Sequence, residues 1–334
     1  MAIDDNEMDQ EDGANQTYRT ATHELVHFYY QDNIVMNEEA DRTSQYPIEV
    51  KPRLVRQMIY HNLINAYEQE DKRDEYLSYA KYWLDLYKQE HNQEFLNIKS
   101  TDIAEATARY TENPGDFIGE NLSKEDSKKK AIENIQKEEI FESADSESYE
   151  IGYVAALLLD ELKPDWKYNF YESGLTVEET LLESISPKTQ EVDKDLEKKV
   201  TEKIQDSNEF AKEAIDPISK ALSDETIPFL KLDIDNAATS YTMQGNYNYQ
   251  DHEIMAKFSS QYSFEGKTID IKEQSIIFEF PDNGQGVVVV PLTKDFEYKD
   301  GVLTVNTSNL TMDCVKVNES KEGNRTIYTV KVDQ

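Results

Sequence analysis

Over roughly the first two thirds of the chain, hydrophobic residues recur at intervals of three and four, the period of a helix that buries one face. Two such stretches, 55–66 and 77–87, flank the charged segment 69–74 and predict an αα-hairpin. The same pattern predicts further helices over 17–30, 151–162 and 188–222. Cap residues predict a short helix over 101–110, and the lysine- and glutamate-rich segment 124–140 predicts a surface helix. The stretch 151–162 is strongly apolar, so we expect it to be buried against the helix over 17–30.

Local signals suggest the ends of two of these helices. Thr101 and Asp102 are good cap residues for the helix over 101–110, which should end before Asn113-Pro114-Gly115. Pro164 should stop the apolar helix over 151–162 because proline cannot continue a helical hydrogen-bond ladder.

Beyond about residue 230 the pattern changes to short runs rich in β-branched and aromatic residues, including 268–280, 287–292, 302–305 and 327–332. Turn signals such as Asp282-Asn-Gly284 and Lys299-Asp-Gly301 separate the runs. The alternation in Thr268-Ile269-Asp270-Ile271 predicts an antiparallel sheet with one packed face and one wet face. The sequence therefore predicts an α+β chain: a disordered acidic arm over 1–16, a mainly helical domain over 17–228 and a β-sandwich or small barrel over 229–334.

Composition narrows the functional classes. The 334 residues include 68 acidic and 35 basic side chains, for a formal net charge of -33, which disfavours binding to nucleic acid and to anionic membrane surfaces. No apolar run approaches the roughly 20 residues of a membrane-spanning helix. Cys314 is the single cysteine, so an intrachain disulfide and a cysteine-based zinc finger are both excluded. Any metal site must use histidines and carboxylates.

The segment Thr22-His23-Glu24-Leu25-Val26-His27 contains a His-Glu-x-x-His motif within a predicted helix. Four residues make about one helical turn, so both imidazoles project from one face and can bind one zinc ion, with the glutamate beside them. A catalytic zinc usually has a third protein ligand. A carboxylate is favoured, because no His-x-x-Gly-x-x-His continuation follows and the remaining histidines form no ligand pattern; these are His61, His91 and His252.

Two downstream segments resemble those of the gluzincin metallopeptidases. Residues 103–110 are similar to a Glu-Gly-x-Ala-x-Tyr segment, with Glu105 at the position of the third zinc ligand and Ala106 in place of the glycine. Tyr149-Glu150-Ile151-Gly152 resembles the Tyr-Glu-x-Gly segment of gluzincin aminopeptidases, whose tyrosine stabilises the tetrahedral intermediate. The resemblance implies that role for Tyr149.

Alternatives to these assignments remain open. Glu150 is the rival third ligand, Tyr149 could be an ordinary tyrosine near a helix start, and the small residues around Glu105 would suit any close helix contact. The aminopeptidase Gly-x-Met-Glu-Asn motif is absent, and few residues precede His23, so aminopeptidase specificity is not implied. A calcium site has little support, since Asp233-x-Asp235 alone is weak.

The functional expectation is a zinc-dependent peptidase that acts on a peptide or protein substrate. His23, His27 and Glu105 would bind Zn²⁺, Glu24 would act as general base on the water that zinc activates, and Tyr149 would steady the oxyanion. The alternative is a catalytically inactive zincin-like protein that binds other molecules at a surface.

The remaining expectations concern the strands and the location of the protein. The C-terminal strands should contribute no zinc ligand, with His252 their one candidate, and could engage substrate or cell-surface material. The excess of lysine over arginine and the single cysteine resemble exported proteins of Gram-positive bacteria. An extracellular or cell-surface location is expected, with the export signal missing from this sequence.

Overall fold

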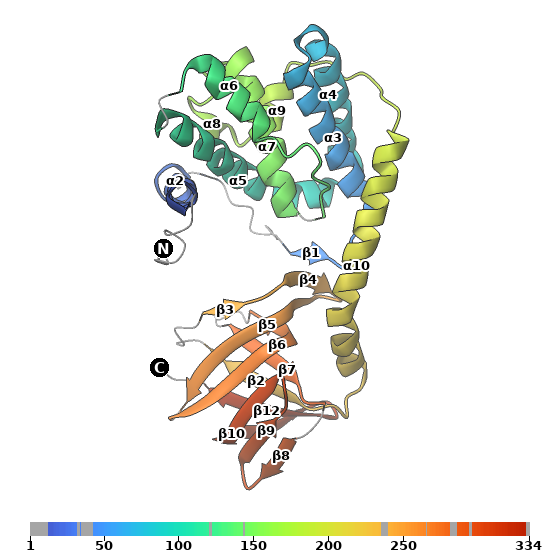
Figure 1. Cartoon of the computed structure of the whole chain (residues 1–334). Coiled ribbons are helices and arrows are strands. Elements are labelled where there is room, and N and C mark those ends of the chain that lie inside the picture. The colour runs from blue at the N-terminus through green and yellow to red at the C-terminus, as the bar shows by residue number, and fades with distance from the viewer. Residues whose placement is uncertain are drawn as a thin grey trace. The chain divides into compact units, whose positions relative to one another are not determined.

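The computed structural model describes residues 13–31, 34, 43–119, 122–142, 144–234, 240–264, 266–280, 286–293 and 296–331. Helices in the first part of the chain are followed by a mostly antiparallel sheet, so the predicted α+β class is confirmed (Figure 1). The chain divides into two compact units, the helical unit (Met1–Arg42 and Glu49–Ile204) and the β unit (Thr43–Ile48 and Gln205–Gln334). The division falls inside one long helix, α10 (Lys194–Ser223).

The helices follow the hydrophobic periodicity, with shifted ends. Their bounds are α2 Gly13–Tyr30, α3 Val50–Glu68, α4 Arg73–Glu90, α5 Asn92–Gly119, α6 Lys124–Glu133, α7 Ala144–Leu162, α8 Phe170–Ser173, α9 Val177–Leu182 and α10 Lys194–Ser223. Helices α3 and α4 pack together as the predicted αα-hairpin. Residues 1–12 of the expected acidic arm lie outside the described residues, and Gly13–Gln16 belong to α2.

The prediction of a short helix over 101–110 was wrong. Helix α5 begins at Asn92 and continues through position 114 to Gly119. Phe95 and Ile98 are buried, which extends the apolar face of the helix towards its N-terminus. Asp102 lies inside α5 and therefore does not cap it. Its carboxylate instead accepts hydrogen bonds from the buried guanidinium of Arg56. Tertiary contacts therefore override the local signal at this position.

Helix α5 lies against both α2 and α7. Helix α7 packs mainly on α5 and α3, instead of on the helix over 17–30 as the sequence suggested. Small residues permit the close approach of α5 and α7. A Cβ atom built on Gly152 would lie 2.0 Å from the Cβ of Ala106, so only glycine fits at this crossing.

A buried ionic cluster joins the helices beside this crossing. Arg56 of α3 is fully buried and donates to both oxygens of Asp102 on α5, at 2.7 and 3.0 Å. Its Nε donates to Glu147 of α7 at 3.1 Å, and its Nη1 lies 3.6 Å from Oε1 of Glu178 on α9. Ser148 adds a hydrogen bond to Asp102 at 2.6 Å. Charges buried this deeply must stay paired, so the cluster restricts how the four helices can be arranged.

The β unit contains one continuous sheet whose strands pair in the order β1-β4-β5-β6-β7-β2-β12-β11, with β3, β8, β9 and β10 beside this path. The strands are β1 Ser44–Gln45, β2 Phe229–Asp233, β3 Tyr241–Thr242, β4 Gly245–Tyr249, β5 His252–Phe264, β6 Lys267–Glu279, β7 Val287–Pro291, β8 Phe296–Lys299, β9 Val302–Asn306, β10 Leu310–Lys316, β11 Asn318–Glu322 and β12 Arg325–Lys331. Most pairs are antiparallel, whereas β12 pairs with β2 and β1 pairs with β4 in parallel.

Alternate residues of the strands enter two different cores. Val288 and Val290 of β7 join a core formed by strands, while Val289 between them packs with residues 211–221 of α10. The predicted alternation at 268–271 is confirmed, because Ile269 and Ile271 are buried and Thr268 is exposed. None of the described helices is both long and apolar enough to cross a membrane.

The crossing of α5 and α7 gives a test of stability. Gly152→Ala should lower the free energy of unfolding by about 1–3 kcal/mol, because the added methyl group overlaps Ala106. Ala106→Gly alone should cost about 1 kcal/mol through lost helix propensity. In the double variant the overlap with the Cβ of Ala106 is removed, and the 2.8 Å approach to the Cα of residue 106 remains. Urea denaturation should therefore show a favourable coupling of about 0.5–3 kcal/mol between the two sites. Strictly additive effects would contradict the close contact.

Candidate metal centre

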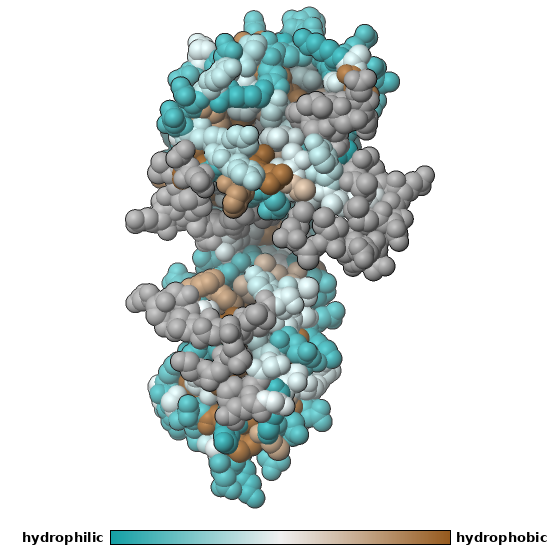
Figure 2. All heavy atoms as spheres, turned by 90° about the vertical axis from the view of Figure 1, so that its left-hand side faces the viewer, coloured by the Kyte–Doolittle hydropathy of each residue, from teal (hydrophilic) through white to brown (hydrophobic). Residues whose placement is uncertain are grey.

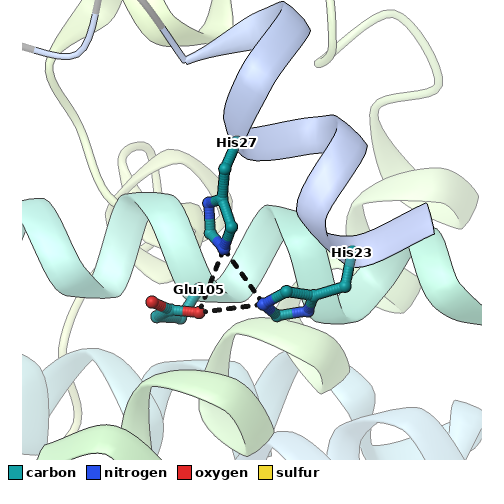
Figure 3. A group of neighbouring side chains, drawn as sticks. All are labelled: His23, His27 and Glu105. Carbon is teal, nitrogen blue, oxygen red and sulfur yellow. Dashed lines mark hydrogen bonds and ion pairs between the residues drawn. The ribbon is translucent and has the colours of Figure 1, made fainter. Parts of the chain in front are cut away.

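Two helices bring the predicted ligands together. His23 and His27 lie one turn apart on α2, and Glu105 projects from α5, which packs against it (Figure 3). The Nε2 atoms of the two histidines are 3.0 Å apart. Oε2 of Glu105 lies 3.2 Å from Nε2 of His23 and 3.5 Å from Nε2 of His27. Three ligand atoms therefore surround one point.

These distances fit a small cation with tetrahedral coordination. Ligand atoms about 2.0–2.2 Å from a tetrahedral centre lie about 3.3–3.6 Å from one another. The three observed separations, 3.0, 3.2 and 3.5 Å, need little adjustment to reach that range. The group can hold a metal ion, and no other His, Cys, Asp or Glu cluster among the described residues has this arrangement.

The opposite nitrogen of each imidazole has its own partner. Nδ1 of His23 lies 2.9 Å from Oε1 of Glu112, and Nδ1 of His27 lies 2.6 Å from Oε1 of Gln31. Both partners are oxygen acceptors, so they favour a proton on Nδ1 and leave the lone pair of Nε2 directed at the centre. This is the tautomer that a metal ligand requires.

Glu150, the rival third ligand, has a different role. Its Oε1 accepts from Nε of Arg109 at 3.3 Å, and its Oε2 accepts from the hydroxyl of Tyr60 at 3.4 Å. Arg109 also donates to Glu112 at 2.7 Å, so it links Glu150 to the partner of His23. The geometry brings Glu105, and not Glu150, to the two histidines.

The electrostatics of the site favour positive charge at its centre. Burial alone would lower the pKa of His23, but hydrogen bonds with Glu105 and Glu112 and their negative charges raise it to about 9. Burial raises the pKa of Glu112, but His23 and Arg109 outweigh that effect and hold the pKa below its ordinary value. A proton on His23 and a metal cation satisfy the same negative surroundings, so they compete.

Glu24 and Tyr149 reach the same cavity as the ligands. A cavity of about 520 Å³ is lined by all five predicted site residues together with Gln31, Ile34 and Ala104. The ring of Tyr149 stacks on that of His23, with centroids 5.6 Å apart and an interplanar angle of 21°. Glu24 is exposed and belongs to the residues that line the cavity.

The other residues that the sequence raised lie outside this group. His61, His91 and His252 belong to α3, to the end of α4 and to β5. Asp235, part of the weak calcium pattern, falls outside the described residues. The cluster contains no residue of the described strands.

Sequence reasoning missed Gln31, Glu112 and Arg109. Gln31 follows His27 by four residues and Glu112 follows Glu105 by seven, so each shares a helical face with a ligand. This helical spacing was the signal in the sequence that could have identified Gln31 and Glu112 as neighbours of the ligands. With 68 acidic residues in the chain, however, a glutamate at helical spacing is too common to be informative by itself.

Comparison with known proteins gives no match. No protein-family model matches the chain, and no curated protein or solved structure is significantly similar to it. The functional interpretation therefore depends on the motifs and on the geometry of the site.

Replacing the two candidate carboxylates one at a time tests which of them binds the metal. Loss of a hydrogen-bond partner outside the ligand group typically weakens metal binding by about 10–100-fold. Glu105→Gln should weaken zinc binding by more than this, because it removes a charged candidate ligand. Glu150→Gln should stay within that smaller range, since Glu150 contacts Arg109 and Tyr60. Competition with a chromophoric chelator measures both affinities. The reverse order of effects would assign the third ligand to Glu150.

Proposed function

We propose that this protein is a zinc-dependent peptidase of the gluzincin type, which hydrolyses peptide bonds in a peptide or protein substrate. The observation that carries the proposal is the convergence of His23, His27 and Glu105 at one point, in a cavity that Glu24 and Tyr149 also line. Two imidazoles and one carboxylate form a donor set that suits zinc and leaves a coordination position for catalysis.

Zinc, when bound, supplies Lewis acidity that polarises a carbonyl group and lowers the pKa of water to about 7. Glu24 follows His23 on α2 and lines the cavity, so its carboxylate can take a proton from the attacking water and deliver it to the leaving amine. Tyr149 lies beside His23, where its phenol can donate a hydrogen bond to the developing oxyanion.

Exposed apolar side chains on α2, the helix that carries His23 and His27, support a polypeptide substrate. On α2, Leu25, Phe28 and Tyr29 have exposed fractions of 50%, 71% and 65%. Figure 2 views the side of the helical unit where α2 lies in Figure 1, and hydrophobic residues gather on this face. An exposed group of apolar side chains of this kind gives a polypeptide a surface to contact.

The proposal includes an extracellular or cell-surface location, for which the composition of the chain is the support. The β unit would then engage substrate or cell-surface material.

Glu24→Gln separates hydrolysis from metal binding. Glutamine keeps the size of the side chain but cannot accept the proton of water, so turnover of an unfolded protein substrate should fall by about 10²–10⁴-fold. Zinc content should stay at the wild-type level, because Glu24 is outside the ligand group. Metal analysis and a fluorogenic protease assay give the two readouts. A zinc-loaded wild type that cleaves nothing would instead favour the inactive binding protein.

Tyr149→Phe tests the oxyanion role. Loss of the hydroxyl should reduce kcat by about 10²–10³-fold and leave KM nearly unchanged, because the hydrogen bond forms in the transition state. Tyr168→Phe is the matched control, since Tyr168 is 78% exposed and does not line the cavity. Equal activity of the two variants would remove Tyr149 from the mechanism and leave it as a packing residue beside His23.

A further inference from the structure

Gln31 occupies a position that connects the two ligand-bearing helices. It follows the last residue of α2 and comes four residues after His27, so its side chain lies on the same helical face as both histidines. It also lines the cavity. Each end of its amide group has a defined partner.

The nitrogen of the amide is directed at α5. Nε2 donates to the backbone carbonyl of Ala104 at 2.8 Å and to Oγ1 of Thr107 at 3.0 Å. Because a backbone carbonyl can only accept, the NH₂ group must be the one that faces α5. Thr107 is itself held in place, since its hydroxyl donates to the carbonyl of Ile103 and accepts from Tyr171, both at 3.0 Å.

The oxygen of the amide therefore faces His27. An amide oxygen can only accept, so Nδ1 of His27 must donate across the 2.6 Å contact. The orientation of Gln31 thus determines which nitrogen of His27 carries the proton. A glutamate at this position could accept from His27 but could not donate to Ala104, and it would oppose that carbonyl with a negative charge.

We propose that Gln31 is a positioning residue for the metal centre. It holds His27 in the tautomer protonated on Nδ1, which leaves Nε2 to bind the metal, and it secures the end of α2 to the helix that carries Glu105. Being neutral, the amide does this without adding charge to a site that already contains Glu105 and Glu112. The inference rests on the metal binding in the proposed function and does not require hydrolysis.

Gln31→Met tests the proposal, because methionine has a similar length and lacks both hydrogen-bonding groups. In metal-free protein in alkaline buffer, the ¹⁵N chemical shifts of the imidazole of His27 should report the Nδ1–H tautomer for the wild type. In the variant they should move towards the Nε2–H tautomer that free imidazoles prefer. Zinc affinity, measured by chelator competition, should fall about 10–100-fold.

A pair of threonine variants provides the control. Thr107→Val removes the hydroxyl that supports Gln31 and should weaken zinc binding in the same direction, by a smaller factor. Thr111→Val removes a hydroxyl one turn further along α5, which donates to the carbonyl of Thr107 at 2.7 Å, and should leave affinity unchanged. Circular dichroism of each variant serves as the control for folding.

The outcomes separate the two proposals. A folded Gln31→Met that keeps both the Nδ1–H tautomer of His27 and wild-type zinc affinity would overturn the positioning role, as would equal effects of Thr107→Val and Thr111→Val. A wild type that binds zinc but hydrolyses no peptide would overturn only the proposed function. A wild type that binds no zinc would overturn both.

Discussion

The contact between α5 and α7 at Ala106 and Gly152 is the constraint on which the site depends. Glu105 precedes Ala106 and Tyr149 lies three residues before Gly152, so the distance between the two helices sets the distance between these two candidate site residues. A larger residue at either position would separate the helices and move Glu105 relative to Tyr149. The small residues are a packing requirement, and the position of the ligand follows from it.

The ionic cluster around Arg56 reinforces the same arrangement. Asp102 lies one turn before Glu105, and Glu147 and Ser148 come directly before Tyr149. Hydrogen bonds are directional and a buried charge cannot be left unpaired, so this cluster specifies the register of α5 against α7 more strictly than apolar contacts would. The buried charges therefore fix how α5 and α7 are aligned at the site. They can do this while contributing little to the net stability of the fold.

The features of the fold and of the candidate site that could be predicted were those encoded by residues close together in the sequence. The His-Glu-x-x-His spacing places two imidazoles on one face, and the hydrophobic period gave the αα-hairpin and the later strands. The start of α5 could not be predicted, because Asp102 resembles a cap residue until Arg56 is found beside it. The two-residue strand β1 has no hydrophobic pattern and exists through its pairing with β4. Gln31 and Glu112 depend on contacts between helices, which spacing along one helix does not reveal.

Helix α2 supplies two of the three candidate ligands, yet among the described elements it packs chiefly on α5. A metal bound by His23, His27 and Glu105 would thus cross-link α2 to the rest of the helical unit, much as a disulfide joins two segments. Opening of α2 would then require release of the ion, and each tenfold rise in free metal above the dissociation constant would make that opening about 1.4 kcal/mol less favourable. The protection of the amide hydrogens of α2 from exchange would then depend on the concentration of metal in the surroundings.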